Sequence, residues 1–286
     1  MDGGSSGPPF CCRETHMLTG DPIFIGGVPR SGTTLLRVIL DTHPRIFCGT
    51  ELRAVNALAS LWTSAHVHSG RVLDEAYALP PESVCAIFSE LILSFLRPAW
   101  DASGKPRIAE KTPSNVLAFP ALRRLFPQSP LVHVLRDVRD VVASRLERDR
   151  EHAGASFDAV ATARLRAREW ADTMAIRRQM LSDPNLAYAY CEIRYEDLVR
   201  HPERTLIPLF EFIGERFDPA VLEFHRVSRS VAGTEEWSAQ AVQRSIFTSS
   251  IGRWREVLGE AELDAIAREA RDASRDAGYS LDLEGR

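Results

Sequence analysis

Short apolar runs alternate with amphipathic stretches along most of the chain. Apolar runs with the length and residue types of buried strands lie at 22–27, 107–109, 131–135 and 188–193. Stretches with apolar residues at helical spacing predict helices at 33–41, 51–64, 81–97, 114–125, 138–150, 156–181 and 261–277. Strands that alternate with helices are typical of a parallel sheet covered by helices. The pattern therefore predicts an α/β fold.

The organisation along the chain is simple. No internal repeat is visible, and a Gly/Ser/Pro-rich composition is confined to the first twenty residues. We expect residues 1–20 to be a disordered lead, with Met17 as an alternative start, and residues 21–286 to form one domain. The lead has neither the basic nor the apolar region of a signal peptide. No run of about eighteen apolar residues occurs, so we expect no membrane span.

Charge and cysteine usage exclude several classes of protein. The 35 Lys and Arg residues against 39 Asp and Glu give a net charge of −4, whereas proteins that grip nucleic acid usually carry an excess of positive charge. The five cysteines show no C-x-x-C spacing, which argues against a zinc site and against a secreted disulfide framework. We therefore expect no nucleic-acid partner and no metal.

The segment Gly-Gly-Val-Pro-Arg-Ser-Gly-Thr-Thr at 26–34 joins the first strand to the first helix. Its glycines let successive backbone N–H groups turn toward an anion at the helix N-terminus. Gly27 to Gly32 has the spacing of a nucleoside-triphosphate loop, but Thr33 stands where ATP and GTP enzymes carry Lys. The cation of this loop is instead Arg30. The segment therefore predicts a phosphate cradle and disfavours a P-loop kinase or other NTPase.

A second group of cations follows the strand at 131–135. Arg136 lies at the carboxyl end of this strand, where parallel sheets bind ligands. Ser144 and Arg148 are four residues apart on the following helix, so they share one face. These three side chains predict an anion clamp.

The run Pro-Arg-Ser-Gly-Thr-Thr-Leu-Leu at 29–36 resembles the 5′-phosphosulfate loop of sulfotransferases that use 3′-phosphoadenosine 5′-phosphosulfate (PAPS). The longer run at 23–49 is similar to tyrosylprotein sulfotransferases, including bacterial RaxST-like members, and the similarity recurs along 22–255. The resemblance implies a P-loop-type three-layer α/β/α fold with a central, mostly parallel sheet. It also implies PAPS as the sulfuryl donor, without a metal, held by Pro29, Arg30, Ser31, Gly32, Thr33, Thr34, Arg136, Ser144, Arg148, Tyr195 and Arg253.

The resemblance also implies residues near the acceptor. In Cys-Gly-Thr-Glu-Leu-Arg at 48–53, Glu51 matches the second Glu of the family's Cys-Gly-Glu-Glu-Thr-Arg and would be the general base. Arg53 matches the Arg of that motif, which lies on the acceptor side, although Thr50 and Leu52 depart from the family pattern. Without the family, Glu51 could also be a carboxylate that complements a helix dipole.

Two further residues would stabilise the moving sulfuryl group together with Arg30. Lys111, in Glu-Lys-Thr-Pro at 110–113, resembles the Lys of the family's Asn-Lys-Asp-Pro. Ser238 lies sixteen residues before Trp254, where the family has its catalytic Ser, and Ser245 is the alternative if the register of this loop differs.

The resemblance implies a tyrosine in a protein or peptide as acceptor, flanked by acidic residues, and it allows a homodimer. Two alternatives stay open. The acceptor could be a carbohydrate or small-molecule hydroxyl, because the segment from Arg53 to Pro106 carries no acceptor signature. The chain could also be a silent nucleotide-binding module, which the joint presence of Glu51, Lys111 and both anion clamps disfavours.

The cysteine pattern also bears on compartment. Secretory-pathway members of the family pair the Cys at position 48 with another just before the Lys motif, and they carry a membrane anchor. Here Ala109 occupies the partner position. We therefore expect an unpaired Cys48 and a cytoplasmic protein.

Overall fold

The structure, a computed structural model, describes residues 21–153, 157–227 and 244–281. These residues contain a parallel sheet with the strand order β2-β3-β1-β4-β5. The strands are β1 (Ile23–Gly26), β2 (Ile46–Cys48), β3 (Arg107–Lys111), β4 (Leu131–Leu135) and β5 (Tyr190–Arg194). The alternation of apolar and amphipathic segments thus correctly predicted a parallel sheet.

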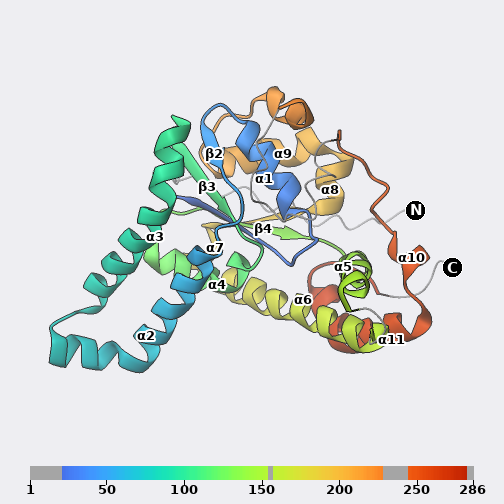
Figure 1. Cartoon of the computed structure of the whole chain (residues 1–286), viewed down its shortest axis with the longest axis horizontal. Coiled ribbons are helices and arrows are strands. Elements are labelled where there is room, and N and C mark those ends of the chain that lie inside the picture. Colours follow the sequence, from blue (N-terminus) through green and yellow to red (C-terminus); the bar gives the residue numbers. More distant parts are fainter. Residues whose placement is uncertain (1–20, 154–156, 228–243, 282–286) are drawn as a thin grey trace, which may run out of the picture.

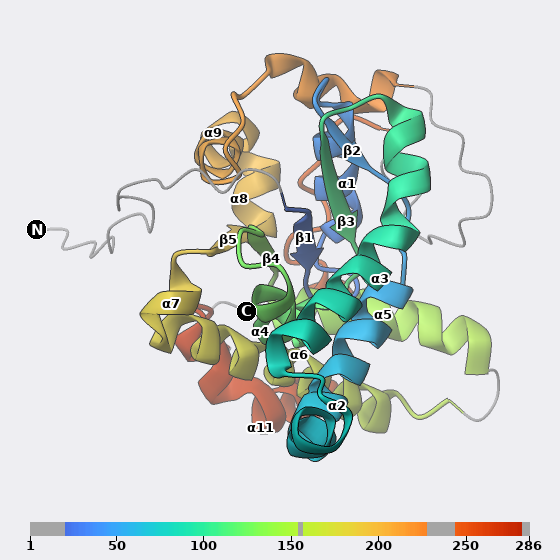
Figure 2. The same ribbon diagram turned by 90° about the vertical axis from the view of Figure 1, so that its left-hand side faces the viewer.

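Helices cover both faces of this sheet (Figures 1 and 2). One face packs against α1 (Thr33–Thr42), α8 (Tyr195–Arg200), α9 (Pro202–Phe212) and the 3₁₀ helix η2 (Pro219–Arg226). The other face packs against the start of α2 (Ala54–Tyr77), α3 (Pro81–Ser103) and α4 (Asn115–Leu125). A third apolar cluster joins α5 (Val138–Ala153), α6 (Ala159–Ser182), α10 (Trp254–Val257) and α11 (Glu260–Asp276). Between α6 and β5 lies the single turn α7 (Pro184–Ala187). The result is three layers, helix–sheet–helix.

The strands differ from the prediction at the sheet edge that carries chemistry. β3 continues two residues beyond the predicted 107–109 and includes Glu110 and Lys111, both of which are buried. Charged residues inside a strand carry no hydrophobic signal, so the pattern could not show them. β2 was not predicted because it has only three residues. β5 begins at Tyr190 rather than at 188.

The helices α2 and α3 form a long hairpin that extends away from the sheet (Figure 1). Helix α2 continues beyond the predicted 51–64 because its outer turns are little buried and lack an apolar period. Helix α3 continues beyond the predicted 81–97, past Pro98, to Ser103. In α2 the buried side chains are confined to its first nine residues, Val55, Ala59 and Trp62. The hairpin exposes apolar side chains on α3, namely Ile87, Leu91 and Phe95.

Helix α3 bears on the expectation that no segment spans a membrane. It has 23 residues, and an 18-residue window reaches a mean hydropathy of 1.3 with 17% of that window buried. Among the described residues, this helix is long and apolar enough to cross a membrane by length and composition. Ser and Glu interrupt the apolar run without lowering its average hydropathy below that of a candidate span. Length and hydropathy alone do not show a span, so the expectation of no membrane span stays a prediction.

Candidate active site

The loop between β1 and α1 lies at the carboxyl edge of the sheet. Arg30 and Gly32 have positive φ angles of 80° and 97°, and Ser31 N–H closes a turn onto Val28 O at 3.0 Å. A Cβ atom on Gly32 would lie 2.4 Å from ring carbon Cδ2 of Tyr195. Glycine is therefore required at position 32 both by its backbone conformation and by the contact with Tyr195.

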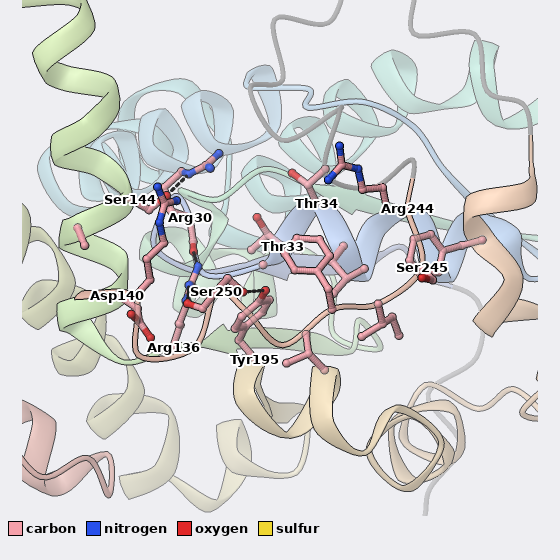
Figure 3. A pocket seen from close by; sticks show the side chains of 18 residues that line it. Arg30, Thr33, Thr34, Arg136, Asp140, Ser144, Tyr195, Arg244, Ser245 and Ser250 are labelled. Atoms are coloured by element: carbon pink, nitrogen blue, oxygen red, sulfur yellow. Dashed lines mark hydrogen bonds between the residues drawn. The ribbon is translucent and has the colours of Figure 1, made fainter. Parts of the chain in front are cut away.

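A pocket opens above this loop and is lined from α1, α5, α8 and the C-terminal segment 244–253 (Figure 3). The side chains of Arg30, Thr33 and Thr34 face it. Next to them Ser31 is 1% exposed, and its buried hydroxyl has no hydrogen-bond partner among the described residues. Because buried hydroxyls are normally hydrogen-bonded, this orphan atom is the kind of feature that a bound anion would satisfy.

Two of the three residues predicted to form an anion clamp, Arg136 and Ser144, line the pocket. Arg136 Nη1 donates to the Arg30 carbonyl at 2.8 Å, its Nη2 donates to the Ser250 carbonyl at 2.6 Å, and its guanidinium stacks on Tyr195 at 4.4 Å from the ring centre. Arg30 Nε donates to Ser144 Oγ at 2.9 Å. The phosphate loop and the strand-end clamp are thus one contact network rather than two separate sites.

The positive charges of this network act on one another. Burial, followed by the charges of Arg136 and Arg148, lowers the pKa of Arg30 from 12.5 to about 10. Arg148 is itself exposed and does not line the pocket, so it acts on Arg30 through its field. Arg136 Nε is buried without a partner among the described residues. A pocket with crowded cations and unsatisfied donors is suited to a ligand that carries several negative charges.

The C-terminal segment 244–253 closes one side of the pocket and is held by a residue that the sequence analysis did not single out. Asp140, which is 2% exposed, accepts from Gly252 N–H at 2.8 Å and from Trp254 N–H at 3.0 Å. Between these two anchors Arg253 lines the pocket and pairs with Glu147 on α5. Tyr195 Oη lies 2.6 Å from Ser250 Oγ. The sequence does show an acidic residue four positions after Arg136, but an acidic residue in the first turn of a helix is too common to indicate this role.

Glu51 and Lys111 meet at the opposite side of the phosphate loop. Lys111 is fully buried, and its Nζ lies 2.7 Å from Glu51 Oε1 and 3.4 Å from Thr34 Oγ1. Lys111 reaches this position because β3 pairs with β1 in a register that sets it beside Ile25, at the start of the loop. The structure therefore brings the predicted base, the predicted cation and the phosphate loop into one cluster.

Other predicted residues lie further out. Arg53 is exposed directly before α2, and Pro29 is exposed; neither lines the pocket. Ser238 lies outside the described residues, whereas the alternative Ser245 lines the pocket. Among the described residues, no group of three or more His, Cys, Asp or Glu side chains is arranged to hold a metal ion. Cys48 is buried and forms no disulfide with another described residue.

The fold and this site define an α/β enzyme that binds a phosphate-rich donor at the carboxyl edge of its sheet. Comparison with known sequences gives the family: the profile of the Sulfotransferase family matches residues 22–219. The chain belongs to the sulfotransferase family, which confirms the resemblance noted from the sequence.

Individual relatives agree with this assignment. The chain is 30% identical over 254 residues to a putative protein-tyrosine sulfotransferase of Caenorhabditis briggsae, a match that covers 86% of this chain and 85% of the relative. It is 30% identical over 242 residues to protein-tyrosine sulfotransferase 1 of Homo sapiens, covering 81% of this chain and 62% of the human protein.

Solved structures support the fold. The sulfotransferase domain of the Synechococcus PCC 7002 olefin synthase superposes with a TM-score of 0.64 at 23% identity, covering 92% of this chain and 96% of that domain. Mouse sulfotransferase SULT7A1, solved in complex with PAP, gives a TM-score of 0.57 at 16% identity and covers 90% of this chain and 86% of its own. The P-loop-type three-layer fold expected from the sequence is confirmed.

The comparisons overturn the expected compartment. The relatives are animal protein-tyrosine sulfotransferases, the group from which the missing cysteine pair had seemed to separate this chain. Helix α3 is moreover apolar enough to span a membrane. The prediction of a cytoplasmic protein is therefore wrong. It failed because one missing disulfide partner reports on one bond and not on the compartment.

Proposed function

We propose that this sulfotransferase transfers the sulfuryl group of PAPS to the hydroxyl of a tyrosine in a protein or peptide, and that residues 21–286 do so as one domain. The observation that carries the proposal is the cluster in which Lys111 lies 2.7 Å from Glu51 and 3.4 Å from Thr34. It joins a candidate base to the loop that would hold the donor. The names of the relatives support tyrosine as the acceptor.

The residues of the pocket fit PAPS. PAPS carries phosphate on the 3′ and 5′ positions of its ribose. The pocket presents two connected sets of hydrogen-bond donors. The loop residues Arg30 to Thr34 would hold the 5′ side, with the orphan hydroxyl of Ser31 among them. Arg136, Ser144 and Arg148 would hold the 3′-phosphate, Tyr195 would contact the adenosine, and Arg253 would lie near the phosphates. When bound, PAPS supplies the sulfuryl group.

The chemistry of the chain's own side chains follows from their positions. Glu51 would accept the phenolic proton of the acceptor, because its carboxylate is the acidic group in contact with Lys111 and is partly exposed, at 23%. Lys111 and Arg30 would stabilise the negative charge that develops on the departing phosphate oxygen. We assign Ser238 the same role as a hydrogen-bond donor.

We also propose how the acceptor peptide is bound. Arg53 is an exposed cation between Glu51 and the start of α2, where it would pair with carboxylates that flank the target tyrosine. We therefore propose acidic acceptor peptides, and a homodimer by analogy with the family.

Transfer of ³⁵S from labelled PAPS tests the proposal. The panel contains an acidic tyrosine peptide, the same peptide with Phe for Tyr, the same peptide with Lys for its acidic residues, an oligosaccharide and a simple phenol. We expect label on the acidic tyrosine peptide, none on the Phe peptide and less on the Lys peptide. Label confined to the oligosaccharide or the phenol would refute a protein acceptor, and tighter binding of Mg²⁺-ATP than of PAPS would refute the donor.

A further inference from the structure

Glu110 is a buried carboxyl group that the proposed chemistry does not use. It lies in β3 directly before Lys111 and is 3% exposed. Its oxygens accept three hydrogen bonds: Oε1 from Leu52 N–H at 3.1 Å and from Thr112 Oγ1 at 2.7 Å, and Oε2 from Asn115 Nδ2. The three donors come from two segments: Leu52 precedes α2, whereas Thr112 lies in the turn from β3 to α4 and Asn115 begins α4.

One of these donors belongs to the segment that carries the candidate base. Side chains of successive strand residues point to opposite faces of a sheet, so Glu110 and Lys111 leave β3 in opposite directions. Lys111 binds the side chain of Glu51, whereas Glu110 binds the backbone N–H of the next residue, Leu52. The segment with Glu51 is therefore fastened twice by neighbouring residues of one strand.

The same carboxyl group is connected to the phosphate loop. Asn115, which is fully buried, donates from Nδ2 both to Glu110 and to the carbonyl of Ile25 at 3.3 Å, just before the loop. The next turn adds a second link, since Gly27 N–H donates to Pro113 O at 2.9 Å. A single buried cluster thus relates the position of Glu51 to the position of the loop.

A buried carboxyl group is not what sheet stability alone would favour, because removing its charge from water costs several kcal/mol unless hydrogen bonds compensate. An apolar residue would fill the same space without that cost. All three hydrogen-bond donors point toward one carboxylate, which indicates that Glu110 serves to hold these groups in fixed positions.

We propose that Glu110 is a positioning residue: it holds the backbone at Leu52 so that the Glu51 carboxylate stays between Lys111 and the acceptor hydroxyl. The inference rests on the proposed role of Glu51 as the base. Glu110→Gln keeps the size of the side chain, but an amide cannot accept from all three donors.

The first test compares rate with donor binding and with local exchange. We expect Glu110→Gln to lower kcat about 10- to 100-fold, by analogy with residues that orient the side chains of metal ligands. The dissociation constant of PAP should stay within about twofold. Hydrogen exchange should quicken in a peptide covering 49–53 and stay unchanged in one covering β4. The matched control Asn56→Ala removes another bond between α2 and the β3–α4 turn, from Asn56 Nδ2 to Ser114 O at 2.8 Å, and should leave kcat within about twofold.

A mutant cycle with Glu51→Asp separates positioning from general damage. If Glu110 acts through Glu51, the loss caused by Glu110→Gln should shrink to below about threefold in the Glu51→Asp background. Losses that multiply, an unchanged kcat, or faster exchange throughout the protein would overturn the inference. Should Glu110→Gln fail to fold, Thr112→Val removes one of the three bonds and should lower kcat about threefold with faster exchange at 49–53.

The results that would refute the proposed function differ from those that would refute the role of Glu110. If Glu51→Ala and Glu51→Asp both keep the full kcat, Glu51 is not the base, whatever Glu110→Gln does. If Glu110→Gln alone abolishes turnover under those conditions, Glu110 is itself the proton acceptor and the positioning role is refuted.

Discussion

The two sides of the site are built differently. On the donor side, Arg136 binds the backbone at Arg30 and Ser250 and stacks on Tyr195, while Tyr195 packs against Gly32. On the acceptor side, the Glu51 segment is fastened by two neighbouring residues of β3, and Arg53 beyond it is exposed. Among the described residues, the donor side is thus held by contacts between several elements, whereas the acceptor side is held mainly from β3.

The largest effect should follow a change on the donor side. Arg136→Ala removes a buried, hydrogen-bonded cation from the proposed 3′-phosphate clamp and should weaken PAP binding about 100-fold or more, measured by calorimetry. Arg123→Ala is the matched control, because Arg123 is also buried but stacks on Tyr188, which precedes the amino end of β5. Equal losses from both substitutions would show that the effect is general destabilisation.

A smaller effect should follow Gly32→Ala. Alanine at a φ of 97° is strained, and its Cβ would overlap the Tyr195 ring, so we expect unfolding free energy to fall by about 2 kcal/mol or more, together with PAP affinity. Gly104→Ala is the control, since Gly104 has a φ of 66° and no neighbour within 4 Å. It should cost about 1 kcal/mol. If the two substitutions lower the unfolding free energy equally, the contact between Gly32 and Tyr195 does not stabilise the donor side.

The acceptor side contains a buried group that should make stability depend on pH between 4.5 and 7. Burial raises the pKa of Glu110 from 4.5 to about 7, although its hydrogen bonds and Lys111 act in the opposite direction. Between these values the folded state binds more protons than the unfolded state. Stability should therefore fall as the pH rises from 4.5 to 7, by up to about 1.4 kcal/mol per pH unit, and level off above 7.

Urea unfolding at several pH values would measure this slope. Glu110→Gln cannot titrate at this position, so its unfolding free energy should lack the Glu110 contribution and vary less between pH 4.5 and 7. An unchanged slope would show that the group responsible lies elsewhere.

The two segments that meet on the donor side could be recognised in the sequence because each is contiguous, although their binding of the donor stays a prediction. The loop 26–34 and the segment 134–148 each combine a strand end, a turn and a helix start, and such contiguous patterns fix their own geometry. The roles of Glu110 and Asp140 could not be predicted, because each binds backbone N–H groups that are 58 and 112–114 residues away in the sequence. The outer turns of α2 were missed for another reason, since exposed helical turns leave no apolar period.

The central claim is that Glu51 is the general base. The most direct test measures two constants for Glu51→Ala: kcat with an acidic tyrosine peptide as acceptor, and the dissociation constant of PAP. If Glu51 is the base on the acceptor side, kcat should fall at least 100-fold, and the dissociation constant of PAP should stay within about twofold. A kcat close to that of the unsubstituted enzyme, or a large loss of PAP affinity, would contradict the account.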